Sequence, residues 1–279
     1  MTVSRRARDL LQAGASLPAG DLAAQTDGRS AARLMAVLRV VAASQEHGLR
    51  TSEVSAELGL SYTTARRILA GLLAEGAVEL SEDGRRFRIG EEITLLGLAR
   101  AGPFALGSCA LPHMQYLVRT FGETVYLTVC SRWDSVCIHR EIGTSERKVL
   151  SISRGSRRPL GVAVGSIAML GAMTSARSEA IVAANADRYP RYGIAADRVR
   201  HRVACARIQG HAYADPGLRQ GTRSVGVAIR DPGGEPMASL SIVAIASRLD
   251  DGVRARMAND LGAVATATAQ EMAARAAGR

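Results

Sequence analysis

The segment SYTTARRILAGLLAEG, residues 61–76, combines a polar start with an apolar stripe along one side. Its first residues supply hydroxyl groups and guanidinium groups, from Ser61, Tyr62, Thr63, Thr64, Arg66 and Arg67. Arginine can donate to guanine edges or to phosphate oxygens, and hydroxyl groups can contact phosphates and bases. These residue types therefore offer non-covalent contact with an anionic partner.

The apolar spacing in this segment predicts a helix with one buried side. Ser61 is placed to cap it and Gly76 to end it, and the stripe consists of Ala65, Ile68, Leu69, Leu72 and Leu73. The opposite side carries Thr63 and Arg67, and then only Ala70, Gly71 and Ala74. Small residues let another surface approach the backbone, and the DNA major groove admits a helix in this way. For this helix alone, an ordinary solvated face explains the pattern equally well.

The neighbouring segments favour DNA binding over a solvated face. Apolar residues recur at helical spacing over residues 31–48, and Thr51 is placed to cap a short helix that Gly59 ends. Residues 51–76 therefore predict a helix-turn-helix. Asp83-Gly84 separates two alternating runs and predicts a β-hairpin, whose second arm carries Arg85, Arg86 and Arg88. Those arginines suit contact with the DNA backbone or minor groove.

These elements divide the chain into parts. We expect a flexible N-terminal extension over residues 1–30, a winged helix-turn-helix over 31–90, a linker helix over 91–103 and a second domain over 104–279. In the second domain, strands are predicted over 123–131, 134–142, 147–153, 224–231 and 237–246, and helices to residue 121, to 173, and over 176–187, 196–209 and 249–276. The segregation of strands and helices predicts an α+β domain with an antiparallel sheet.

A glycine-rich turn in the second domain, RPLGVAVGS, opens a predicted helix and offers backbone N–H groups from Gly161 to Ser166 to an anion. A tight turn that packs helix against sheet is the equal alternative. Charge favours the anion, because residues 103–279 contain 23 basic and 14 acidic side chains, whereas 31–102 contain nine of each. Candidates to attract an anion are Arg140, Arg154, Arg157 and Arg158.

Composition excludes several classes of protein. The chain has 279 residues, is 47% hydrophobic and carries a net charge of +10, which fits a globular protein of one or two domains. No apolar run approaches the roughly 20 residues of a membrane helix, and the arginine-rich N-terminus is too short in apolar residues for a secretory signal. The four cysteines show no paired spacing, so we expect reduced thiols, no disulfides and a cytoplasmic location.

The sequence also offers little to an enzyme. His201, Cys205 and His211 lack a fourth metal ligand, and no GxSxG, HExxH or Walker sequence is present. We expect no catalysis, no metal and no cofactor. An enzyme with a DNA-binding head would need a nucleophile–base pair or a metal cluster in the second half, and a pure assembly module with a vestigial head is a third interpretation.

The ordered set of segments resembles the IclR family of transcriptional regulators, from about Ala31 to the end. The segments on which the resemblance rests are RLMAVLRVVAASQEHGLRTSEVSAELGLSYTTARRILAGLLAEGAVELSEDGRRFRIG, then GETVYL, the strand ending CIHR, and the turn at Gly161. The resemblance implies a GAF-like effector-binding domain and a homodimer or homotetramer that binds a double-stranded DNA operator. Such regulators act as repressors or activators.

Within that resemblance, the effector would contact Gly161, Val162, Ala163, Asp215, Ser224 and Ser241. The family's turn His is Gly161 here, its strand Cys is Ser224, a pocket Asp falls on Ala214, and a later Ser is Val243. These exchanges remove polar groups and add space. We therefore expect a larger, partly apolar carboxylate, with aromatic acids included, in place of small polar oxo-acids.

Overall fold

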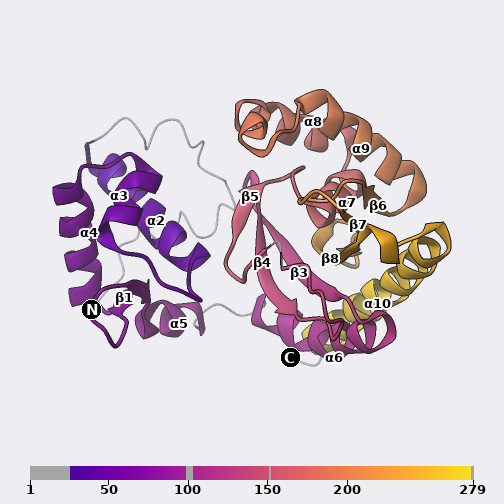
Figure 1. The fold of residues 1–279 in the computed structure, drawn as a ribbon, viewed down its shortest axis with the longest axis horizontal. Coiled ribbons are helices and arrows are strands. Elements are labelled where there is room, and N and C mark those ends of the chain that lie inside the picture. The colour runs from indigo at the N-terminus through magenta and orange to yellow at the C-terminus, as the bar shows by residue number, and fades with distance from the viewer. Residues whose placement is uncertain (1–25, 99–102, 151, 278–279) are drawn as a thin grey trace.

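The computed structural model describes residues 26–98, 103–150 and 152–277. Two packed parts lie side by side, the helical first part in indigo and purple and the second part built around a sheet (Figure 1). Residues 1–25 of the predicted flexible extension lie outside the described residues, whereas its residues 26–30 belong to a helix. The linker helix predicted over 91–103 contains α5 (Glu91–Leu98) and the first residue of α6 (Pro103–Phe121).

The first part consists of three helices and a two-stranded hairpin. Its elements are α2 (Thr26–Ala43), α3 (Thr51–Leu58), α4 (Tyr62–Ala74), β1 (Val78–Leu80) and β2 (Phe87–Ile89). Buried residues from the three helices and β1 form one core around Val41, Val54 and Leu69. The predicted helix-turn-helix and hairpin are thus present, although the first helix begins at Thr26 instead of Ala31.

The second part contains an antiparallel sheet of six strands in the order β5-β4-β3-β8-β7-β6. After α6, its elements are β3 (Thr124–Ser131), β4 (Asp134–Glu141), β5 (Arg157–Pro159), α7 (Val164–Ala172), α8 (Ser175–Ala184), the 3-10 helix η1 (Ala186–Tyr192), α9 (Ala196–Gln209), β6 (Ala212–Ala214), β7 (Thr222–Arg230), β8 (Pro236–Ile245), the 3-10 helix η2 (Ala246–Arg248) and α10 (Asp251–Ala277). The predicted α+β class is confirmed.

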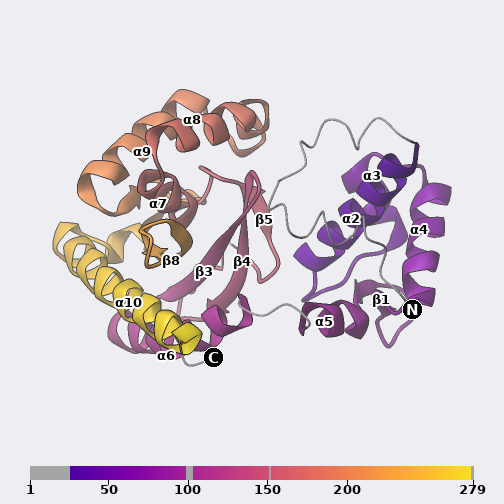
Figure 2. The ribbon, with the colours of Figure 1, turned by 180° about the vertical axis from the view of Figure 1, so that it is seen from behind.

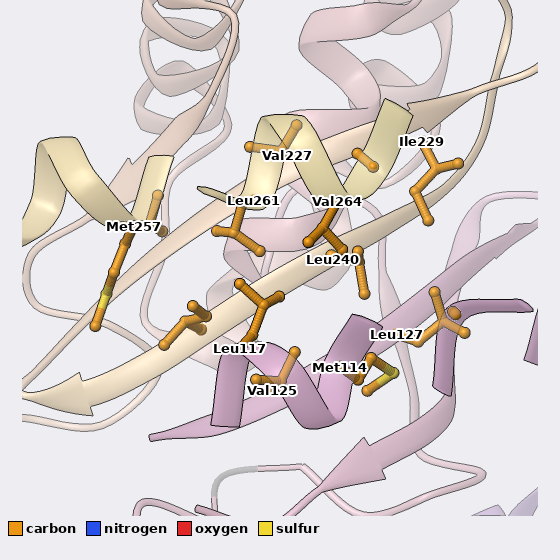
Figure 3. Close-up of a cluster of buried hydrophobic side chains, with 14 of the residues drawn as sticks. Met114, Leu117, Val125, Leu127, Val227, Ile229, Leu240, Met257, Leu261 and Val264 are labelled. Atoms are coloured by element: carbon orange, nitrogen blue, oxygen red, sulfur yellow. The ribbon is translucent and has the colours of Figure 1, made fainter. Parts of the chain in front are cut away.

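Both faces of this sheet are covered, and the side-chain alternation of the strands assigns each residue to one face. Leu127, Ile229 and Leu240 point toward α6 and α10, whose Met114 and Leu261 complete the core between them (Figure 3). Seen from behind, α10 and α6 run along each other across that face (Figure 2). The other face contacts α7 and leaves space for a cavity.

One predicted strand is wrong, because residues 147–150 and 152–153 form no strand. Side chains form hydrogen bonds with backbone carbonyl groups of this segment instead. The Tyr126 hydroxyl donates to Val149 O at 2.9 Å, and Arg140 Nη1 donates to Ile152 O at 3.1 Å. The edge position beside β4 belongs to β5, which the sequence did not predict. Tertiary contacts thus override the local β pattern of this segment.

Candidate functional site

Helix α4 is anchored by the predicted stripe. Ala65 and Leu69 are fully buried, and the Ser61 Oγ accepts a hydrogen bond from the Thr64 N–H at 3.2 Å, so Ser61 is the N-cap as predicted. Leu73 departs from the expected stripe, since it is 37% exposed at the end of the helix. The core therefore holds α4 mainly through its first three turns.

The polar start of α4 faces solvent. Tyr62, Thr63, Arg66 and Arg67 are all exposed. Neither arginine takes part in an ion pair or hydrogen bond with any described residue. The same side continues with exposed Ala70, Gly71 and Ala74, and a Cβ built on Gly71 meets no atom within 4 Å. The helix thus presents two unpaired cations followed by a bare stretch of backbone.

The three hairpin arginines have different roles. Arg86 Nη1 donates to Gly48 O at 3.0 Å and lies 3.4 Å from Glu53 Oε2, so it fixes the hairpin to α3. Arg88 is half-buried on β2, and its Nε atom lacks a partner among the described residues. Arg85 alone of the three is exposed. Arg85 is therefore the exposed one of the three, whereas Arg86 would have to break its contacts to meet a partner and Arg88 is partly covered.

A groove of about 580 Å³ lies between α3, α4 and the hairpin. Its lining includes Thr51, Tyr62, Arg66 and Arg85, which come from three separate segments. Thr51 is the first residue of α3 but not its cap, since Arg50 holds that position and its N–H donates to Glu53 Oε2 at 2.7 Å. The structure thus brings together predicted contact residues that are far apart in the sequence.

The second site is a cavity of about 710 Å³ on the α7 face of the sheet. Two cross-strand rows form its floor: Tyr126 pairs with Ser241, and Val243 pairs with Ser224. Cross-strand partners point to the same face, which places both serines in the cavity. Both serines are buried, and their hydroxyl groups form no hydrogen bond within the described part of the chain.

Two glycines let α7 approach this floor closely. A Cβ on Gly226 would lie 3.1 Å from the Gly165 nitrogen, and a Cβ on Gly165 would lie 2.6 Å from the Ser239 Oγ. Val162, Ala163 and Val164 line the cavity just before and at the start of the helix. The first-turn N–H groups of a helix have no intrahelical acceptor, so this end is electropositive.

Gly161 lies outside the cavity lining. Its φ is +102°, and a Cβ there would meet Val199 Cγ1 at 2.6 Å and the Tyr189 hydroxyl at 2.9 Å. The Gly161 N–H donates to the Ser166 Oγ at 2.9 Å. Of the amides expected to bind an anion, that of Gly161 is therefore already occupied, and this glycine serves the close packing of the turn.

Asp215 also lies outside the lining, whereas its neighbour Pro216 belongs to it. The Asp215 Oδ2 accepts from Arg223 Nε at 2.8 Å. Val162, Ala163, Ser224 and Ser241 are the predicted effector-binding residues that the structure brings together around the cavity. Four of the six predicted residues therefore share one site.

Arginine enters the cavity at positions that the sequence prediction largely missed. Arg158 lines it as a predicted candidate, and Arg191, Arg198 and Arg202 line it as well. Of the other candidates, Arg157 pairs with Asp134 at 3.2 Å, and Arg154 is exposed outside the lining. A detectable signal was the Arg198 and Arg202 pair one turn apart on a predicted helix.

Arg140 connects the two parts of the molecule. Its Nη1 donates to the carbonyl of Ile152, which lines the cavity, and its Nη2 donates to Glu46 Oε1 at 2.7 Å. Glu46 follows α2, so a single guanidinium group joins the cavity wall to the helix-turn-helix. Gly155 packs nearby, since a Cβ on it would lie 2.3 Å from the Ala42 carbonyl oxygen.

No metal-binding cluster is found among the described residues. His201 Nε2 and Cys205 Sγ are 3.7 Å apart, and burial raises the pKa of the Cys137 thiol to about 12. In the described ranges, no helix is long and apolar enough to span a membrane.

Comparisons with known proteins match both parts of the chain. A family model described as "IclR helix-turn-helix domain" matches residues 30–82, and one described as "Bacterial transcriptional regulator IclR C-terminal" matches residues 104–270. The glycerol operon regulatory protein of Streptomyces coelicolor is 30% identical over 224 residues, which are 79% of this chain and 86% of that protein. The Pca regulon regulatory protein of Pseudomonas putida is 27% identical over 76% of this chain and 73% of that protein.

Solved structures share the fold. An IclR transcriptional regulator from Alicyclobacillus acidocaldarius superposes with a TM-score of 0.70 at 20% identity, over 88% of this chain and 98% of that one. An IclR homolog from Microbacterium hydrocarbonoxydans, complexed with 4-hydroxybenzoate, has a TM-score of 0.68 at 21% identity, over 88% and 99% of the two chains. The chain therefore belongs to the IclR family of transcriptional regulators, which are DNA-binding proteins and not enzymes.

Proposed function

We propose that α4 is the recognition helix of this regulator and that its operator binding responds to a small effector in the cavity. The observation that carries this proposal is the exposed start of α4, where Arg66 and Arg67 have no partner among the described residues. In a helix-turn-helix, the N-terminal residues of the second helix reach base edges in the major groove. Tyr62, Thr63 and Thr64 share that end of α4, and Ser61 caps it.

Gly71 and its small neighbours support a close approach of α4 to DNA. With Ala70 and Ala74, Gly71 forms an exposed side on which no long side chain holds the backbone away from a groove. Thr51 and Arg85 line the groove beside α4 and would contact phosphate oxygens. Because residues 31–102 carry equal numbers of basic and acidic side chains, affinity depends on where these cations lie.

The effector that we propose is a partly apolar carboxylate. Its acid group would accept from the hydroxyl groups of Ser224 and Ser241 and from the first-turn amides of α7. Ile194, Leu218 and Val243 supply apolar wall, and the cavity of about 710 Å³ exceeds the needs of a small oxo-acid. The 4-hydroxybenzoate complex of one structural neighbour supports this class of ligand.

Arg140 offers a route by which the cavity affects DNA binding. A ligand that moves Ile152 also moves the carbonyl that holds Arg140, and thereby its ion pair with Glu46 beside the helix-turn-helix.

We further propose that the protein acts as a homodimer or homotetramer. Two copies of α4 would then meet a two-fold operator at half-sites one helical turn apart.

A footprint of the full-length protein on the intergenic DNA beside its own gene tests the proposal. We expect one protected, approximately palindromic site whose occupancy changes with organic acids. Absence of any protected site, with or without these acids, contradicts the proposal. Protection that survives unchanged in the Arg66→Ala/Arg67→Ala variant contradicts the role of α4 as the recognition helix.

A further inference from the structure

The charge of the cavity lining is one-sided. Four arginines line it, namely Arg158, Arg191, Arg198 and Arg202, and the lining in the described residues contains no Asp or Glu. A monocarboxylate needs one guanidinium group for a bidentate pair, in addition to the hydroxyl groups of the floor. The lining therefore contains more guanidinium groups than one carboxylate can pair with.

The two α9 arginines that line the cavity are not held in ion pairs with described residues. Arg200, on another side of the same helix, donates from Nε to Glu179 Oε1 at 3.0 Å and from Nη1 to Asp197 Oδ1 at 2.8 Å. Arg198 and Arg202 lie one turn apart on this helix. Neither forms an ion pair with any described residue. Burial lowers the pKa of Arg202, and the nearby charge of Arg198 lowers it further.

Arg158 brings positive charge from a different element. It lies on β5, pairs there with Ser135 and is half-buried beside Tyr126 and Tyr192. Burial is the largest cause that lowers the pKa of Arg158, and Arg219 adds a like-charge contribution. Arg158 thus adds a second, partly desolvated cation to the cavity lining, on an element other than α9.

We propose that the effector carries two separate anionic groups, one held by Arg202 with Arg198 and the other by Arg158, across a partly apolar middle. This inference rests on the proposed effector function and narrows its ligand class from carboxylates to two-headed organic anions. Dicarboxylates and acids that combine a carboxylate with a phosphate or phosphonate group share this chemistry. The arginines would then select by the number of charges, and the apolar walls by the size of the middle.

Calorimetry on the full-length protein tests the charge count directly. The probes are succinate, adipate and terephthalate, each beside its monomethyl ester, at constant ionic strength and a pH at which every carboxyl group is ionised. A second arm compares phosphonoacetate with methylphosphonate. We expect at least one two-headed anion to bind about tenfold or more tightly than its single-headed partner. If no two-headed anion shows such an advantage, the inference is overturned.

Variants assign the two ends. Arg202→Gln and, separately, Arg158→Gln should remove most of the advantage of the two-headed anion and leave the affinity for the monoester nearly unchanged. Arg200→Gln is the matched control, because it removes the same charge from the same helix outside the cavity lining. An equal loss for both ligands in Arg202→Gln, or an equal loss in Arg200→Gln, contradicts the assignment. Melting temperatures without ligand verify that each variant folds.

The results separate this inference from the proposed function. If monoesters bind as tightly as diacids and also change operator occupancy, the inference of two anionic groups is overturned and the proposed regulatory function stands. If diacids bind selectively but no operator is protected, the proposed function is overturned and the inference of two anionic groups stands.

Discussion

Arg66 with Arg67 on α4, and Arg198 with Arg202 on α9, are two arginine pairs that have no ion-pair partner among the described residues but differ in their surroundings. The α4 pair is exposed on an open helix face, in a part of the chain with balanced charge. The α9 pair borders a cavity, and Arg202 is half-buried. An open face suits a large polyanion that brings its own surface, whereas a walled cavity suits a small anion that must fit.

We therefore expect the α4 pair to affect operator binding and no other property. Arg66→Ala/Arg67→Ala should weaken operator binding by roughly 100-fold or more, because each lost guanidinium contact is worth about 1–3 kcal/mol. The slope of the logarithm of the operator association constant against the logarithm of salt concentration should also become shallower. The change should correspond to about two phosphate contacts if both arginines bind phosphate, and to fewer if they bind bases. Fluorescence anisotropy over a salt series measures both quantities.

Arg33→Ala/Arg39→Ala is the control for that experiment, since these arginines are exposed on α2 in the same part of the molecule. Its operator affinity should change far less. Equal losses in the two double variants would mean that general charge, and not the placement of the α4 pair, determines DNA binding.

The turn before α7 should be sensitive to a single added methyl group. Gly161→Ala places a Cβ at positive φ against Val199 and Tyr189, whereas Gly193→Ala, at φ +66°, meets no atom within 4 Å. Both variants incur the left-handed strain, and overpacking should make Gly161→Ala about 1–3 kcal/mol less stable than the control. Urea denaturation measures the difference, and equal stabilities would contradict the close packing of this turn.

The two regions should also be coupled through Arg140. Arg140→Ala removes its bonds to Ile152 and Glu46, and we expect a loss of about 1 kcal/mol in unfolding free energy. Operator binding without ligand should persist, while the change in operator affinity caused by the tightest acid of the calorimetric panel should shrink. Arg154→Ala, in an exposed position nearby, is the control. An undiminished ligand effect in Arg140→Ala would exclude this route.

The open face of α4 predicts the reverse of the Gly161 result. Gly71→Ala should raise the unfolding free energy by up to about 1 kcal/mol, because alanine is the better helix former and the added Cβ meets no atom. Operator affinity should nevertheless fall a few-fold, since the methyl group holds the helix away from DNA. Gly262→Ala in α10, also free of neighbours, should stabilise the protein without affecting DNA binding. Unchanged affinity in Gly71→Ala would remove the close approach from the proposal.

Much of the first part could be predicted from sequence, because its determinants are local. Helical spacing predicted α3 and α4, Ser61 was predicted as the cap of α4, and Asp83-Gly84 lies in the turn of the predicted hairpin. The contacts of the hairpin arginines were not predictable in this way. Arg86 is held by Gly48 and Glu53, which lie 38 and 33 residues away in the sequence.

The second part shows the same division more sharply. Alternation predicted β3, β4, β7 and β8, but not β5 or β6, which are short edge strands defined by their partners. The strand expected over 147–153 was lost to side-chain contacts from Tyr126 and Arg140. Residue type alone could not distinguish Arg157, which is paired with Asp134, from Arg158, which lines the cavity.

By itself, the sequence determined the order of the elements, the polar start of α4 and the excess of positive charge beyond residue 103, because periodicity, capping and composition are properties of neighbouring residues. The tertiary structure alone decided that Ser224 and Ser241 share one floor, that Gly161 serves packing, and that arginines from β5 and α9 face the same space. Those outcomes depend on strand order and on helices that pack across long sequence separations, which no local pattern encodes.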